Sequence, residues 1–169
     1  MNVRRLVSGD GAIFGRIRIE ALRQEPTSFA ADASDYEHYT AADWEALLAM
    51  RTAFVAFDRE TPIGIASIVP KGLSRLAHRA DVTNVYVTPA HRGTGVSHRL
   101  WTTLESHALS HGISQLEIGV NAANAGVIRF YKGLGFVRTG LVPNGFRDGD
   151  RYFDEILMVK QIGHTSNPA

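Results

Sequence analysis

Residues 84–100 read NVYVTPAHRGTGVSHRL, and they carry the strongest indication of the fold. It continues a run of β-branched and aromatic residues over 82–87, which is typical of a strand and ends before Pro89. Gly93 and Gly95 then predict a turn. Apolar side chains recur at helical spacing after the turn: Val96, Leu100, Trp101, Leu104, Ala108 and Leu109. A strand, a glycine turn and a helix therefore follow one another.

A second strand, expected over 116–120, completes a βαβ unit with parallel strands and a right-handed crossover. Further strands are expected over 2–7, 52–57, 63–69, 137–141 and 152–159, and further helices after Asp10, Thr40 and Asn124. Thr40 and Asp43 have the spacing of a capping box, for a helix that buries Trp44, Leu47 and Leu48. Residues 143–150 are expected to form a turn-rich loop.

The chain has 169 residues, of which 44% are apolar and 21% charged. This favours a single folded domain over 1–169, with a frayed tail at 163–169. The net charge of +1 gives no field to attract nucleic acid or an anionic membrane, so neither is expected as a partner. No segment without Asp, Glu, Lys or Arg is longer than the eleven residues of 118–128, which is too short to cross a bilayer. Because the first residues offer no apolar region for a secretory signal, a cytoplasmic location is expected.

The turn before the expected helix has the features of an anion-binding site. Free backbone N–H groups and the positive end of the helix dipole point to one spot. Gly93 and Gly95 allow a ligand oxygen to approach the backbone, and Arg92 can donate two hydrogen bonds to a phosphate. No Gly-Lys-Ser/Thr follows, and His98 stands where a dinucleotide fingerprint needs glycine. The alternative is a glycine turn that only closes the connection between strand and helix.

The same residues resemble the GNAT family of N-acetyltransferases, whose turn reads Arg/Gln-x-x-Gly-x-Gly/Ala and holds the pyrophosphate of coenzyme A. RGTGVS, at 92–97, matches with Arg92 and Gly95 and has Ser97 in the last position. In the family, the preceding strand lends backbone groups to the acetyl and pantetheine arm. The resemblance implies acetyl-CoA as cosubstrate, no metal, and these cofactor-binding residues: Val85, Val87, Arg92, Gly93, Thr94, Gly95, Val96, Ser97, Asn124 and Tyr131.

A second family motif, N-x-x-A-x-x-x-Y-x-x-x-G-F, is matched by Asn124, Tyr131, Gly135 and Phe136, with Val127 in place of alanine. The likeness extends more weakly to both ends and covers nearly the whole chain. It implies an α/β fold with a mixed, mainly antiparallel sheet of about seven strands, in which the parallel strands 4 and 5 splay around the cofactor. A homodimer is also compatible with the family.

The resemblance implies direct attack of a primary amine on acetyl-CoA in a ternary complex. A lysine-type amine has a pKa of about 10.4, so only about one molecule in a thousand is neutral at pH 7 and a base is needed. Asp81 is the candidate, because carboxylates at the matching strand position are the general base in some family members. Strand alternation places Asp81 on one face with Thr83, Val85 and Val87, and Asn84 on the other. Asp81 could instead be a solvated carboxylate or a salt-bridge partner near Arg79.

The departing thiolate needs a proton or a hydrogen bond, and the Tyr131 hydroxyl is the candidate donor. By its spacing from Ile128 and Leu134, Tyr131 also fits a core stripe. Asn124 could cap its helix, bind the pantetheine amide, or do both. His107 and His111 have the helical spacing of a metal pair, but no third ligand is apparent, and a solvated helix face is expected for them.

The sequence does not identify the acceptor. The segment 25–44 has the position of the family's acceptor loop and could equally cover the core, and 143–150 is the other expected wall. Small-molecule and peptide amines stay open: antibiotic, polyamine, amino acid or protein N-terminus. Two other functions are kept: a GNAT-like regulatory module that binds acyl-CoA with little turnover, and an unrelated nucleotide-binding α/β protein.

Overall fold

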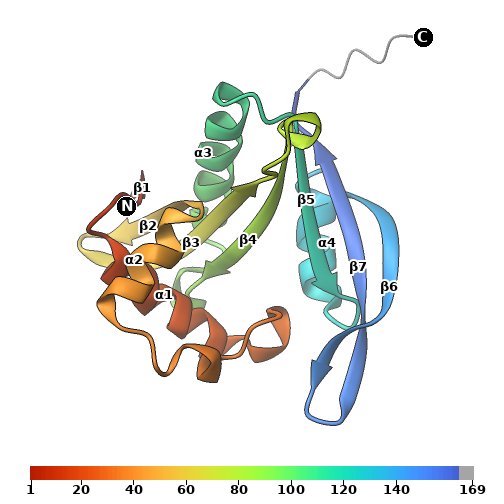
Figure 1. Ribbon diagram of the computed structural model, residues 1–169, viewed down its shortest axis with the longest axis horizontal. Helices are drawn as coiled ribbons and strands as arrows, with labels where there is room; N and C mark the ends of the chain where they lie inside the picture. Colours follow the sequence, from red (N-terminus) through yellow and green to blue (C-terminus); the bar gives the residue numbers. More distant parts are fainter. Residues whose placement is uncertain (164–169) are drawn as a thin grey trace.

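The strands of the chain form one mixed sheet in the order β1-β2-β3-β4-β5-β7-β6, as a computed structural model of residues 1–163 shows (Figure 1). The strands are β1 Asn2–Arg5, β2 Thr52–Asp58, β3 Thr61–Pro70, β4 Arg79–Val87, β5 Gln115–Asn121, β6 Val137–Asp148 and β7 Arg151–Gln161. All neighbours are antiparallel except β4 and β5, which are parallel. The predicted fold class is confirmed. Of the tail expected to fray, all but Gly163 lies outside the described residues.

Helices cover both faces of the sheet: α1 Gly11–Gln24 and α2 Ala41–Ala49 on one, α3 Val96–Ser110 and α4 Ala125–Gly133 on the other (Figure 1). Short 3-10 turns lie at η1 Pro26–Ser28, η2 Ala33–Tyr36, η3 Ser74–Leu76 and η4 Pro89–His91. The α1 side has a core of its own with Phe14 and Ile17, and the α3 side has another with Leu100 and Leu104. None of the described helices has the length and apolar content needed to cross a membrane.

The first residues of α1 and α2 differ in whether the predicted capping bond forms. The Thr40 and Asp43 capping box is present at α2, where Leu48 is buried and Trp44 and Leu47 are half-buried. Asp10 precedes α1 as expected, but its side chain makes no cap bond, because both its oxygens accept from the Arg4 guanidinium at 2.6 and 2.9 Å.

The parallel strands separate soon after they begin. β4 and β5 pair only through Arg79–Gln115, Ala80–Leu116 and Asp81–Glu117. Beyond this point β4 follows β3, and β5 stays paired with β7 as far as Asn121. The two halves of the sheet therefore meet at one end and diverge toward the other, as Figure 1 shows.

β4 contains a β-bulge at Asn84. Ser67 of β3 pairs with Thr83 of β4, and Ile65 pairs with Tyr86. Two residues of β3 therefore span the same distance as three residues of β4, so β4 carries one extra residue. Asn84 has φ 55°, and its side-chain amide donates to Ser67 Oγ at 3.3 Å. The side chain of Asn84 therefore reaches the face that carries Thr83, rather than the opposite face as expected.

The bulge also separates the residues expected to share one face. Asp81 and Thr83 lie on the α1 face, where Tyr86 packs, whereas Val85 and Val87 contact the core under α3 and α4. The prediction that Asp81, Thr83, Val85 and Val87 share a face is wrong, because the extra residue reverses the alternation.

The last hairpin extends further than the sequence predicts. β6 includes most of the expected loop 143–150, and its turn to β7 is short. A register shift lies between Val142, which pairs with Glu155, and Phe146, which pairs with Phe153. The prediction of a loop over 143–150 is therefore wrong. Pro143 lacks a backbone N–H donor, and because it lies within this irregularity the strand continues past it.

Candidate functional site

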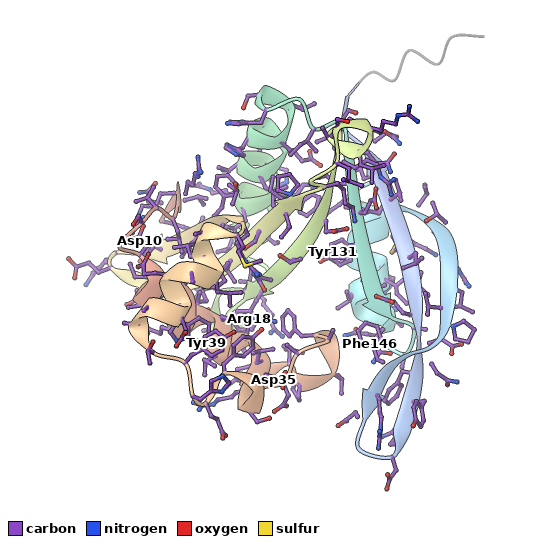
Figure 2. The ribbon with its side chains drawn as sticks, in the orientation of Figure 1. Asp10, Arg18, Asp35, Tyr39, Tyr131 and Phe146 are labelled. Atoms are coloured by element: carbon purple, nitrogen blue, oxygen red, sulfur yellow. The ribbon has the colours of Figure 1, made fainter. Side chains whose placement is uncertain are left out.

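A cavity of about 1150 Å³ lies where β4 and β5 diverge. Its walls come from both strands, α1, α4, the segment after α1 and the β6–β7 hairpin. Figure 2 shows Arg18 and Phe146 on opposite sides of this opening. Eight predicted site residues line it: Asp81, Val85, Val87, Arg92, Gly93, Ser97, Asn124 and Tyr131. Thr94, Gly95 and Val96 are not among the lining residues, and Val96 is buried in the core.

The glycine turn leads directly into α3. Gly93 has φ 74° and Gly95, the N-cap, has φ 87°, so both adopt a conformation that favours glycine. A Cβ at either position would meet no atom within 4 Å. The N-cap has no side-chain bond to the first turn of α3. The positive φ angles thus favour glycine at both positions, and the open space beside them, here called the hollow, adjoins the free N–H groups of the first turn of α3.

Arg92 links this turn to the segment after α1. Its Nη2 donates to Glu25 Oε1 at 2.6 Å, and its Nε donates to the Val87 carbonyl at 3.1 Å. Thr94 Oγ1 donates back to the His91 carbonyl at 2.6 Å, so its side chain holds the turn. The guanidinium of Arg92 therefore sits beside the turn in a fixed orientation.

Two carboxylates and two cations gather where β4 and β5 meet. Lys71 Nζ contacts both oxygens of Asp81 at 2.6 Å. Arg79 donates two hydrogen bonds to Glu117, and these lower the pKa of that carboxyl, with burial opposing them. The Asp81 side chain is 44% exposed and that of Glu117 is 16% exposed. Asp81 therefore has the salt bridge considered for it, with Lys71 as partner, and still lines the cavity.

Tyr131 is at once a core residue and a cavity residue. It is 3% exposed, and its ring packs edge-on against Trp101 and Phe136 at centroid distances of 6.3 and 5.3 Å. Burial raises the pKa of the Tyr131 hydroxyl above its ordinary value of 10.0. The group therefore stays protonated and can donate a hydrogen bond at neutral pH.

Residues 25–28, here called the bridging segment, cross from the β4 side of the cavity to the β5 side. Glu25 holds Arg92, while the Asn121 amide donates to the Thr27 carbonyl at 3.2 Å and the Asn124 amide donates to Ser28 Oγ at 3.1 Å. Asn124 Oδ1 also accepts from the Val127 N–H at 3.1 Å, so its predicted capping role is confirmed.

Among the cavity-lining residues that sequence reasoning missed are Arg18, Thr83 and Glu117. Glu117 could have been found, because parallel pairing of the βαβ unit places the start of its strand beside Asp81. Strand alternation placed Thr83 on the face of Asp81, but its residue type alone does not mark it as a site residue. Arg18 lies on an ordinary amphipathic helix, and nothing in its spacing marks it.

The histidine pair lies away from this cavity. His107 is half-buried and packs edge-on against Phe54 at 5.3 Å, so it is not on a fully solvated face as expected. Within residues 1–163, no three His, Asp or Glu side chains gather as metal ligands would.

Comparison with known proteins gives one family. The model of the acetyltransferase (GNAT) family matches residues 17–136, which include both cavity strands, the glycine turn and α4.

Among the proteins similar to this chain are two curated relatives and one solved structure. The L-methionine sulfoximine/L-methionine sulfone acetyltransferase of Salmonella typhimurium is 34% identical over 86 residues, 50% of each chain. The L-amino acid N-acyltransferase MnaT of Escherichia coli is 28% identical over 85 residues, 50% of this chain and 49% of MnaT. The chain spans about half the length of these curated relatives. The structure of yncA from Salmonella typhimurium with acetyl-CoA has a TM-score of 0.78 at 23% identity, over 100% of this chain and 98% of yncA.

Proposed function

This chain belongs to the GNAT family of acetyltransferases, and we propose that it moves an acetyl group from acetyl-CoA to a primary amine by direct attack in a ternary complex. The observation that carries the proposal is the cavity between the diverging strands β4 and β5. Its lining includes Gly93 of the glycine turn together with Asp81 and Tyr131. Residues from elements on both faces of the sheet line it, Arg18 of α1 on one and Tyr131 of α4 on the other, which suits a reaction between two substrates.

The glycine turn supports binding of coenzyme A. Gly93 and Gly95 leave a hollow that any Cβ would begin to fill, so a phosphate can reach the backbone N–H groups of α3. Arg92 adds a positive charge beside it, and Ser97, the second residue of α3, lines the cavity. When bound, acetyl-CoA supplies a thioester whose acyl carbon is open to attack by an amine.

Asp81 is our candidate to accept the proton of the amine. Removing the proton from the amine at pH 7 costs about 4–5 kcal/mol, because its pKa is about 10.4. The Asp81 side chain is more exposed than that of Glu117, and each carboxylate is held by a cation, Asp81 by Lys71 and Glu117 by Arg79. Lys71 keeps the Asp81 carboxylate in place. As the N–C bond forms, the amine proton passes to Asp81, directly or through water.

Tyr131 is our candidate to stabilise the departing sulfur. Its ring is fixed by Trp101 and Phe136, and its hydroxyl keeps its proton because burial disfavours the phenolate. As the C–S bond breaks, the hydroxyl can donate a hydrogen bond or the proton itself to the thiolate.

The acceptor proposed is a small-molecule amine rather than a protein. The names of the two curated relatives support this, since both refer to small amino-acid compounds. A peptide N-terminus is the second choice. A homodimer and a cytoplasmic location stay predictions.

The test is release of free coenzyme A from acetyl-CoA with a panel of amine classes. The chain has no cysteine, so a thiol-reactive dye detects only the released product. We expect amine-dependent release and an N-acetylated product by mass spectrometry. Tight binding of acetyl-CoA without release for any amine would favour the regulatory module, and preference for ATP or NAD would favour a nucleotide-binding protein.

A further inference from the structure

Arg18, on α1, is a buried guanidinium with an unused donor. The residue is 7% exposed, and its Nη1 has no hydrogen-bond partner. Within residues 1–163 only one other buried side-chain atom is in this position, Thr83 Oγ1. Burying a charged donor without a partner is costly, so such a group is retained where a ligand completes it.

The surroundings hold the guanidinium in place without neutralising it. Its carbon lies over the Phe29 ring at 4.8 Å and over the Tyr36 ring at 5.9 Å from their centroids. Burial lowers the pKa of Arg18, an effect that the Tyr36 side chain partly offsets. Arg51 lies near Arg18. Burial lowers the pKa of Arg51, and the charge of Arg18 lowers it further. An arginine stays protonated under such conditions, so the region is positive.

Arg18 lines the cavity from the face of the sheet opposite to the residues expected along the pantetheine arm. It comes from α1, on the face of the sheet that also carries Asp81 and Thr83. Val85 and Val87, expected along the pantetheine arm, lie on the other face with the α3 core. The bulge at Asn84 separates the two sides, and both lead into one cavity.

We propose that Arg18 binds the carboxylate of the acceptor, and that the acceptors of this site are small amines that also carry a carboxylate, as α-amino acids do. The proposal rests on the proposed acetyl transfer. A planar guanidinium binds a carboxylate through two parallel hydrogen bonds, which uses the free Nη1. The Thr83 hydroxyl offers a further donor on the same face. A polyamine would instead bring positive charge against Arg18, so this class is disfavoured.

The test compares acceptors that differ only in this group. Each L-amino acid is assayed beside its primary amide with wild type, Arg18→Met, Arg18→Lys and Arg16→Met. Arg16 is an exposed arginine of α1 and is the control. We expect Arg18→Met to lower kcat/KM for the free acid about 100- to 1000-fold and for the amide less than about threefold. Arg18→Lys should retain part of the preference, and Arg16→Met all of it. The amine of an amino acid and that of its amide differ in basicity. Because each variant is compared with wild type on the same acceptor, this difference does not affect the ratio.

A binding measurement tests the role of Arg18 without catalysis. The probes are N-acetyl-L-methionine, N-acetyl-L-leucine and N-acetyl-L-phenylalanine, each with its amide, chosen because Phe29, Phe146 and Leu157 make part of the cavity wall apolar. With coenzyme A present, the acids should bind wild type at least about tenfold more tightly than Arg18→Met, and the amides should not distinguish them.

Each outcome has a distinct meaning. Equal loss for acids and amides, or a preference for amides or polyamines in wild type, would overturn the proposal for Arg18 while leaving acetyl transfer intact. No transfer to any amine would overturn the proposed function, and the binding arm would still decide on Arg18. A large fall in Tm for both Arg18 variants with unchanged acid preference would make the residue structural. We expect the Tm of Arg18→Met to equal or exceed that of wild type, because an unpaired buried charge is removed.

Discussion

Arg92 and Glu25 form an ion pair at 2.6 Å that joins the glycine turn of α3 to the bridging segment, 67 residues away in sequence. The two side chains are 48% and 34% exposed, so the pair contributes little to stability. The ion pair matters for ligand binding, because Glu25 puts a negative charge beside the hollow proposed for the pyrophosphate.

Glu25→Gln is expected to strengthen acetyl-CoA binding about two- to fivefold, since it removes a charge that repels the phosphates and competes for Arg92. Isothermal calorimetry measures this, with Glu37→Gln, an exposed acid of the same region, as the control. Arg92→Met should weaken binding about 10- to 100-fold. Weaker binding by Glu25→Gln would mean that Glu25 orients Arg92 rather than competing for it.

Gly95→Ala is expected to weaken acetyl-CoA binding at least about tenfold, because the Cβ would enter the hollow at the N-terminus of α3. The matched control is Gly112→Ala after the other end of the helix, where φ is 77° and a Cβ also meets nothing within 4 Å. Both variants should lose about 1–2 kcal/mol of stability from the positive φ. Thermal shift with acetyl-CoA separates them. Equal loss of binding in both would leave only the structural role of Gly95.

Asp81→Asn is expected to lower kcat about 10²- to 10⁴-fold with little change in acetyl-CoA affinity, because the amide cannot accept the amine proton. Glu117→Gln is the comparison, since Glu117 lies beside Asp81 on β5 but accepts from Arg79. We expect it to cost less than about fivefold in kcat. The reverse ranking would transfer the role of base to Glu117, and a loss under threefold in both would favour water.

Tyr131→Phe is expected to lower kcat and kcat/KM together, about 10- to 1000-fold, while Tm stays close to wild type because the ring and its packing remain. Tyr152→Phe, at a tyrosine that is 57% exposed, is the control. Retained activity with a lower Tm would reduce Tyr131 to a packing role.

Ionisation of Tyr131 should not lower the activity of wild type between pH 7 and 9. Burial raises the pKa of its hydroxyl above 10.0, so the proton donor stays protonated throughout this range. A kcat profile checks this, and a basic limb below pH 9 that Tyr131→Phe abolishes would contradict it.

The sequence alone determined the features that depend on residues a few positions apart. The capping box of Thr40 and Asp43, the N-cap Asn124 and the strand, glycine turn and helix around Gly95 are of this kind. Their hydrogen bonds and φ angles are set within one or two turns of chain, so spacing rules predict them. The family motifs then extended these local signals to the topology of the sheet.

Which side chains meet in the cavity depends on tertiary contacts between distant segments. One extra residue at Asn84 reversed the faces of Val85 and Val87 relative to Asp81, and the register of β4 with β5 placed Glu117 beside Asp81. The burial of Arg18 depends on the loop that packs over it. These relationships join segments far apart in sequence through strand register and packing, and a shift of a single residue changes them, so no local pattern could specify them.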